Sequence, residues 1–154
     1  MMRKILVGAA AGAAGTTALN TITYLDMTWR GRPASSTPEK LVEAVADKAD
    51  LSIPGDGDTR DARLSGLGAL SGIVTGIGIG AAYGLLDALG LRPGLFLGSL
   101  LTGAAAMAAS DGSMAGFGVA DPTTWSGSDW ASDIIPHFGY GAVLSATYNA
   151  AEPR

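Results

Sequence analysis

The sequence predicts an all-α membrane protein: a four-helix transmembrane bundle with glycine-zipper packing and one short amphipathic helix in its first loop. Four apolar stretches alternate with polar ones in a chain of 154 residues with mean hydropathy +0.28. Uncharged runs of about 18 residues or more are typical of helices that cross the hydrocarbon core. We therefore expect a single membrane domain, 1–154, with spans at about 5–25, 64–87, 93–111 and 130–151.

Small residues recur every fourth position in three of these stretches, which places them on one face of each helix. In water each glycine would destabilise a helix by about 1 kcal/mol relative to alanine, whereas in lipid it allows a second backbone to approach closely. A glycine-rich loop or a buried soluble helix is the less favoured alternative. The predicted helix-packing residues are Gly8, Gly12, Gly68, Gly72, Gly76, Gly80, Gly84, Gly94 and Gly98.

The first span follows the basic pair Arg3-Lys4, a pattern that also occurs in secretory signal peptides. The uncharged run 5–25 is longer than the apolar region of such peptides, which has about 7–15 residues, and no small-x-small cleavage motif follows it. We therefore expect a retained transmembrane helix.

The long polar segment 26–63 contains the pattern of a helix start. Ser36 or Thr37 is suited to cap the helix, Pro38 to occupy its first turn, and Glu39 to complete a capping box. An apolar stripe follows, so we expect a short amphipathic helix that ends in a turn at 54–58. Further along the chain, 126–129 carries another turn and cap pattern.

Composition excludes several classes of function. The chain has no Cys and one His, which excludes disulfides, thiolate catalysis and most zinc sites, so we expect no metal and no cofactor. A net charge of −4 without a clustered basic face argues against a nucleic-acid partner.

An up-and-down order of four spans would gather most polar groups at one membrane face. Asp111 is a candidate functional residue because a charge at membrane depth is costly, although an ordinary helix end near the headgroups is the favoured explanation of its position. Because the connection 87–93 is short, we expect the third span to lie beside the second. The predicted polar cluster is Asn20, Tyr24, Asp111, Asp133, His137 and Tyr140, and the predicted interface anchors are Trp29, Trp125 and Trp130.

Two sequence patterns resemble a family of small, glycine-rich bacterial integral membrane proteins without an assigned activity. The first is the run RGRPASSTPE at 30–39, and the second joins Asp121-Pro122, Trp125, Trp130 and Pro136-His137. The resemblance implies a membrane bundle over nearly the whole chain. It supplies no activity, cofactor or catalytic residue.

Three functions are compatible with these features. The favoured one is a non-enzymatic membrane protein that packs through its small-residue faces, as a homo-oligomer or an accessory subunit of a larger complex. The alternative is a small channel or transporter for protons, cations or a lipid headgroup at the polar cluster. An enzyme with His137 as general base and Asp133 orienting it is least favoured, because no Gly-x-Ser-x-Gly nucleophile motif is present.

The same features predict a location and partners. We expect a multi-pass protein of the cell inner membrane whose partners are the lipid bilayer and itself or another membrane protein. The Arg3-Lys4 pair favours cytoplasmic termini by the positive-inside rule, although more Lys and Arg residues lie at the opposite, crowded face.

Overall fold

The computed structural model describes residues 1–153, and its regular secondary structure over that range consists of helices joined by loops. The elements are α1 (Met2–Arg30), α2 (Thr37–Lys48), α3 (Gly57–Ala88), α4 (Leu95–Gly116), the short 3₁₀ helix η1 (Pro122–Thr124) and α5 (Gly127–Ala151). Three of the helices, α1, α3 and α4, are long and apolar enough to cross a membrane.

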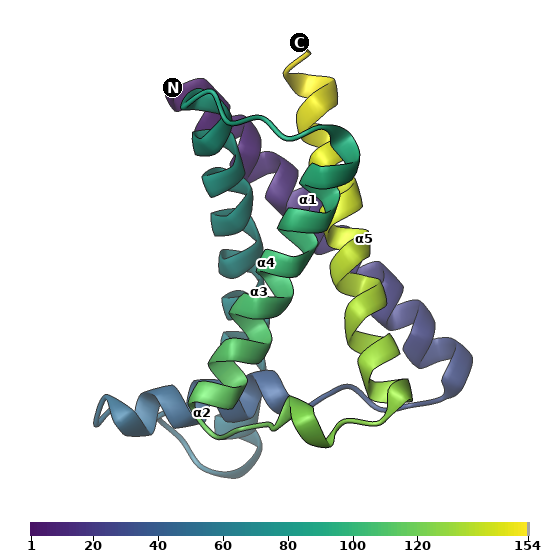
Figure 1. The fold of residues 1–154 in the computed structure, drawn as a ribbon. Helices are drawn as coiled ribbons and strands as arrows, with labels where there is room; N and C mark the ends of the chain where they lie inside the picture. Colours follow the sequence, from purple (N-terminus) through teal and green to yellow (C-terminus); the bar gives the residue numbers. More distant parts are fainter. Residues whose placement is uncertain (154) are drawn as a thin grey trace.

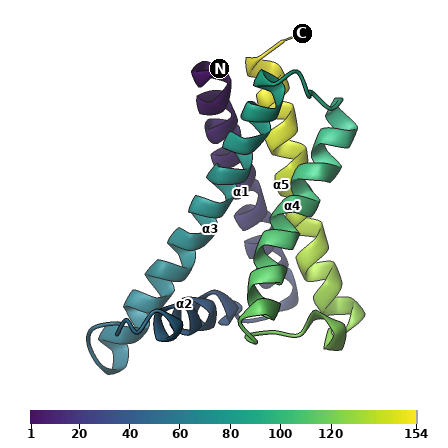
Figure 2. The ribbon, with the colours of Figure 1, turned by 60° about the vertical axis from the view of Figure 1, so that its left-hand side comes forward.

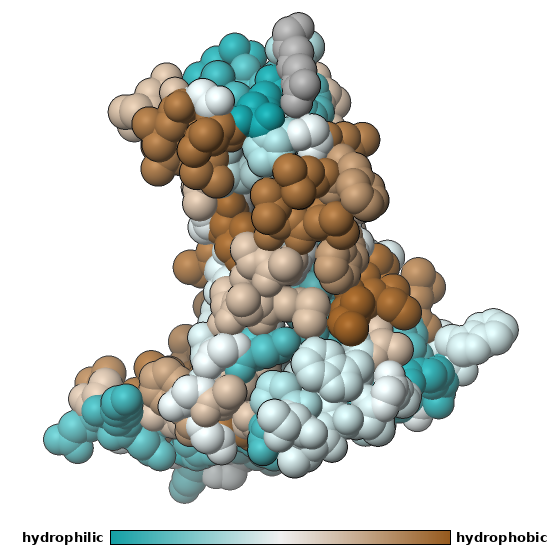
Figure 3. Space-filling view, in the orientation of Figure 1, coloured by the Kyte–Doolittle hydropathy of each residue, from teal (hydrophilic) through white to brown (hydrophobic). Residues whose placement is uncertain are grey.

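Helix α1 lies between α3 and α5, and α4 packs along the other side of α5 (Figures 1 and 2). The two termini lie together at one end of the bundle, while α3 and α4 diverge toward the other end, where α2 crosses beside α3. Hydrophilic residues concentrate at the two ends of the molecule (Figure 3). Many large apolar side chains between them are exposed, as expected of a surface that faces lipid.

The expectation that the third span lies beside the second is wrong, because α4 packs mainly against α5 and touches α3 only weakly. Glycines decide this pairing. A Cβ at Gly103 of α4 would lie 2.9 Å from the carbonyl oxygen of His137, and one at Gly141 of α5 would lie 2.7 Å from the Gly103 nitrogen. These backbones pack directly on each other, and a short connection does not outweigh such a contact.

Helices α1 and α3 meet backbone to backbone in the half of the bundle that holds the termini. A Cβ at Gly8 would overlap the carbonyl oxygen of Gly80 and lie 3.0 Å from the nitrogen of Gly84. One at Gly12 would overlap the carbonyl oxygen of Gly76 and lie 3.1 Å from the Cα of Gly80. Only glycine fits at these positions.

The remaining predicted packing glycines differ in their surroundings. Gly68 lies against Pro38 of α2, and Gly98 lies against Tyr83. At Gly72 and Gly94, however, no described atom outside the neighbouring residues of the same chain segment would lie within 4 Å of a Cβ, so these two do not line a contact with another helix within residues 1–153. The N-terminal half of α3, which contains Gly72, separates from α1 (Figure 2), and Gly94 is the N-cap of α4.

The two predicted caps have different outcomes. Pro38 occupies the first turn of α2 as expected, but the capping box with Glu39 is absent, because the N-cap residue Ser36 makes no side-chain capping hydrogen bond. The backbone N–H of Thr37 donates to Ser35 Oγ at 3.2 Å. At the start of α5 the predicted cap is confirmed. Ser126 and Asp129 form a reciprocal capping box, with N···O distances of 2.9 and 3.2 Å.

Candidate functional site

Four polar side chains meet where the end of α4 lies against the start of α5. His137 Nδ1 lies within hydrogen-bond distance of the Asp133 backbone carbonyl, at 2.8 Å, and 3.2 Å from Asp133 Oδ1, while His137 Nε2 lies 3.3 Å from Ser110 Oγ. The Ser110 hydroxyl also lies within hydrogen-bond distance of Asp111 Oδ1, at 3.2 Å. We call these four residues the His137 cluster. It contains three of the six predicted polar residues.

The local structure of α4 and α5 positions the four side chains of the His137 cluster. Asp133 and His137 are one helical turn apart, so both face the same side of α5. Pro136 lies between them in sequence without ending the helix. On α4, Ser110 and Asp111 follow Gly103, whose missing side chain allows the two helices to approach. The cluster therefore depends on two features. Asp133 and His137 are spaced four residues apart on α5, and α5 packs closely against α4.

The His137 cluster is only partly open to its surroundings. The side chains of His137 and Asp133 are 12% and 18% exposed, and Asp133 Oδ2 is buried without a hydrogen-bond partner in the described chain. Asp111 lies close enough to Asp133 for their charges to interact. Among residues 1–153 no group of three His, Asp or Glu side chains is arranged to hold a metal ion.

The other three predicted members lie elsewhere. Tyr24 is 60% exposed, Asn20 is half-buried, and the hydroxyl of Tyr140 donates to the Gly76 carbonyl at 2.6 Å. Tyr140 is three residues after His137, which rotates it by about 60° around the helix axis. Because α5 is sandwiched between α4 and α1, that rotation directs Tyr140 to α1 and α3.

A second buried cluster, which the sequence reasoning missed, lies at the end that holds the termini. Asp87 is 6% exposed, accepts a hydrogen bond from the Tyr148 hydroxyl at 2.8 Å, and pairs with Lys4 Nζ at 3.1 Å. We call Lys4, Asp87 and Tyr148 the Asp87 cluster. It joins α1, α3 and α5, because each helix contributes one residue.

Arg92 and Glu152 surround the Asp87 cluster. The Arg92 guanidinium donates to Asn149 Oδ1 at 2.8 Å and to the Glu152 carbonyl, and it lies over the Tyr148 ring at 5.6 Å. Arg3 pairs with the Glu152 carboxylate at 3.3 Å. The contacts between these charges were not predicted from the sequence. One signal could have found the cluster: Lys4 lies at the start of the first span, and Asp87 lies at the end of the second.

Buried hydroxyl groups lie along the helices between the two clusters. Thr102 Oγ1 donates to the Gly98 carbonyl at 2.8 Å, and Ser145 and Tyr83 both lie beside Gly98. The exposed fractions of Thr102, Ser145 and Tyr83 are 4%, 0% and 3%. Ser145 Oγ and the Tyr83 hydroxyl have no hydrogen-bond partner among residues 1–153.

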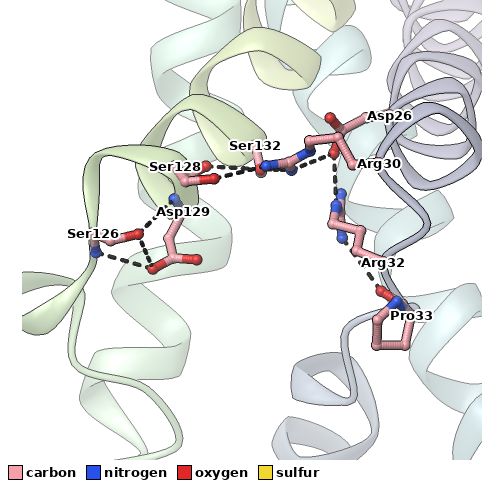
Figure 4. A network of polar contacts seen from close by, with 8 residues as sticks. All are labelled: Asp26, Arg30, Arg32, Pro33, Ser126, Ser128, Asp129 and Ser132. Atoms are coloured by element: carbon pink, nitrogen blue, oxygen red, sulfur yellow. Dashed lines mark hydrogen bonds and ion pairs between the residues drawn. The ribbon is translucent and has the colours of Figure 1, made fainter.

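A third polar network ties the end of α1 to the start of α5 (Figure 4). The Arg30 guanidinium donates to Ser128 Oγ at 2.7 Å, to Asp26 Oδ2 at 2.6 Å and to Ser132 Oγ. Arg32 donates to the same Asp26 oxygen from Nε at 2.6 Å. Two of the predicted interface anchors, Trp125 and Trp130, have ring centroids 5.1 Å apart, and the third, Trp29, is 91% exposed.

The His137 cluster, the Asp87 cluster and the network around Arg30 are the candidate functional groups among the described residues. The resemblance to a family of small bacterial membrane proteins stays a prediction. Comparison with protein-family models, with curated proteins and with solved structures gives no match for this chain.

Proposed function

We propose that this chain is a non-enzymatic, four-span protein of the cell inner membrane that conducts protons along α5, from its contact with α4 to the cluster that it forms with α1 and α3. The observation that carries the proposal is the His137 ring, whose two nitrogens face Asp133 and Ser110 at 3.2 and 3.3 Å. An imidazole can accept a proton at one nitrogen and release one from the other. Carboxylate and histidine chains at membrane depth serve this purpose in pumps and transporters.

Proton conduction by this path requires α5, the expected span 130–151, to cross the membrane as well, although α5 is not among the three helices that are long and apolar enough to do so by composition. Its 25 residues are long enough to cross about 30 Å of hydrocarbon. Buried Ser145 and Tyr148 are among the polar residues that lower its hydropathy, whereas Ile135 and Val143 are exposed. We propose that the exposed side faces lipid, and that the glycine contact of α1 with α3 acts as a zipper that holds the bundle.

A pathway needs proton-binding groups at both ends and hydroxyls between them. The His137 cluster supplies one end and the Asp87 cluster the other. Thr102, Ser145 and Tyr83 would pass a proton between them through their hydroxyls, two of which have no fixed partner in the described chain. With cytoplasmic termini, the Asp87 cluster faces the cytoplasm and the His137 cluster faces the outside.

Proton flux into liposomes tests this function. The purified full chain is reconstituted with a pH-sensitive dye inside, and a potassium gradient with valinomycin sets the voltage. We expect flux above that of protein-free liposomes, and we expect His137→Leu to lower it at least tenfold because the relay loses its imidazole. Asp111→Asn and Tyr148→Phe should also lower it, since they alter the two ends of the path.

The matched control is Tyr24→Phe, which removes a hydroxyl from a predicted cluster residue that lies outside both clusters. Its flux should equal that of the wild type. Helicity and thermal unfolding in detergent establish that each variant is folded. A folded wild type without flux, or a folded His137→Leu with unchanged flux, would contradict proton conduction.

A second candidate is the homo-oligomer or accessory subunit. Gly72 and Gly94 have open space beside them, and Leu70 and Val74 of α3 are exposed, so part of a small-residue face is available for a partner helix. The other glycines of that face are used within the chain itself, which is why we rank this candidate second. Absence of proton flux together with a stable oligomer in mild detergent would favour it.

A further inference from the structure

A cavity of about 220 Å³ opens between α1 and α5 at the end of the bundle that holds the His137 cluster. Its wall is almost entirely apolar and includes Ile22 from α1 and Ile135 and Pro136 from α5. Its polar lining consists of Asp26, Arg30 and Ser132, part of the network in Figure 4. We propose that this cavity binds one anionic phospholipid, with its phosphate at Arg30 and one acyl chain along the apolar wall.

The Arg30 guanidinium at the polar side of the cavity suits a phosphate group through its hydrogen-bond donors, while the carboxylates of Asp26 and Asp129 balance the charges of Arg30 and Arg32. Asp26 accepts hydrogen bonds from both Arg30 and Arg32, so one carboxylate faces two guanidinium groups. The neighbouring Asp129 carboxylate is engaged in the capping box with Ser126 (Figure 4). A guanidinium presents five N–H donors, and those of Arg30 that its protein partners do not use can bind phosphate oxygens.

The apolar wall makes a lipid, rather than a free phosphate ion, the occupant. An apolar cavity of about 150 Å³ holds a molecule the size of benzene, so this larger one can hold several methylene groups. Its polar lining is at the end of α1 and the start of α5, close in sequence to Trp125 and Trp130. Tryptophan is enriched at the headgroup level of membranes. A phosphate at Arg30 would therefore lie at the depth where phospholipids carry theirs.

Binding is measured on the full chain in mild detergent by native mass spectrometry. The probes are phosphatidylglycerol, phosphatidylcholine with the same acyl chains, and inorganic phosphate as a competitor. We expect one phosphatidylglycerol per chain, weaker binding of phosphatidylcholine, and no competition by inorganic phosphate. Arg30→Gln should weaken phosphatidylglycerol binding at least tenfold, and Arg30→Lys should weaken it less.

Two matched controls separate the cavity from its surroundings. Ile135→Trp fills the cavity and should abolish stoichiometric binding, whereas Ile134→Trp alters the adjacent position, which does not line it, and should not. Arg63→Gln removes a guanidinium on α3, far from the cavity in sequence, and should leave binding unchanged. Ile135 is 60% exposed, so its replacement leaves the bundle folded.

Equal phosphatidylglycerol binding by wild type and Arg30→Gln, or equal loss in Ile134→Trp and Ile135→Trp, would overturn the proposal. Competition by inorganic phosphate would overturn the choice of a lipid. The result does not depend on proton flux, because no residue of the His137 or Asp87 cluster is changed.

Discussion

Replacing Gly80 by leucine is expected to force α3 away from α1 and to lower the stability of the protein in detergent sharply. A Cβ at Gly80 would lie 2.7 Å from both the nitrogen and the Cα of Gly12, and it would overlap the carbonyl oxygen of Gly8. All three are backbone atoms of a helix, which cannot turn aside as a side chain can. Overpacking typically costs about 1–3 kcal/mol, and we expect the upper end or more here.

Gly72→Leu is the matched control, because it is the same substitution two turns earlier on the same helix. No atom outside the glycine's immediate chain environment would lie within 4 Å of its Cβ among the described residues. Thermal unfolding in mild detergent should show a large loss for Gly80→Leu and little change for Gly72→Leu. Equal stabilities would contradict the α1–α3 contact. A lower oligomer mass for Gly72→Leu alone would instead favour the homo-oligomer.

Asp87→Leu is expected to cause the second large loss of stability. Asp87 is the acceptor for both Lys4 and Tyr148, so leucine would leave an ammonium and a hydroxyl without their partner. Removing one member of a buried ion pair costs about 3–5 kcal/mol. The Lys4 side chain is 37% exposed and can reach solvent, so we expect the lower end of that range. Asp87→Asn should cost less, because its amide oxygen still accepts from Tyr148.

Asp61→Asn is the control for the Asp87 variants. Asp61 is an exposed carboxylate on the same helix, and surface substitutions of this kind usually change stability by less than about 0.5 kcal/mol. The measurement is again thermal unfolding in detergent. If Asp87→Leu were as stable as Asp61→Asn, the Asp87 cluster would not hold the three helix ends together.

The features that depend on a single helix could be predicted from the sequence. The apolar runs located the long helices, and the spacing of Asp133 and His137 identified a pair that the structure places at 3.2 Å. Which helix faces meet depends on competing contacts between distant segments. For this reason the place of α4 beside α5 and the direction of Tyr140 could not be predicted from periodicity.

The Asp87 cluster and the Arg30 network were missed for a related reason. Charged residues at the ends of spans are usually solvated, and nothing within 84–92 or 26–32 indicates otherwise. Asp87 is buried because the ends of α1, α3 and α5 converge on it, and Arg30 reaches Ser128 from 98 residues away in the chain. Long-range convergence of this kind becomes visible only in the folded chain.

The proposed proton path requires α5 to cross the membrane, and the accessibility of single cysteines tests this directly. The chain has no cysteine, so single substitutions Ser52→Cys, Leu91→Cys, Ser126→Cys and Pro153→Cys can each be probed with an impermeant thiol reagent in intact and in permeabilised cells. The four-span arrangement predicts that positions 52 and 126 react from one side of the membrane and positions 91 and 153 from the other. Reaction of positions 126 and 153 from the same side would contradict it, and with it the proton path along α5.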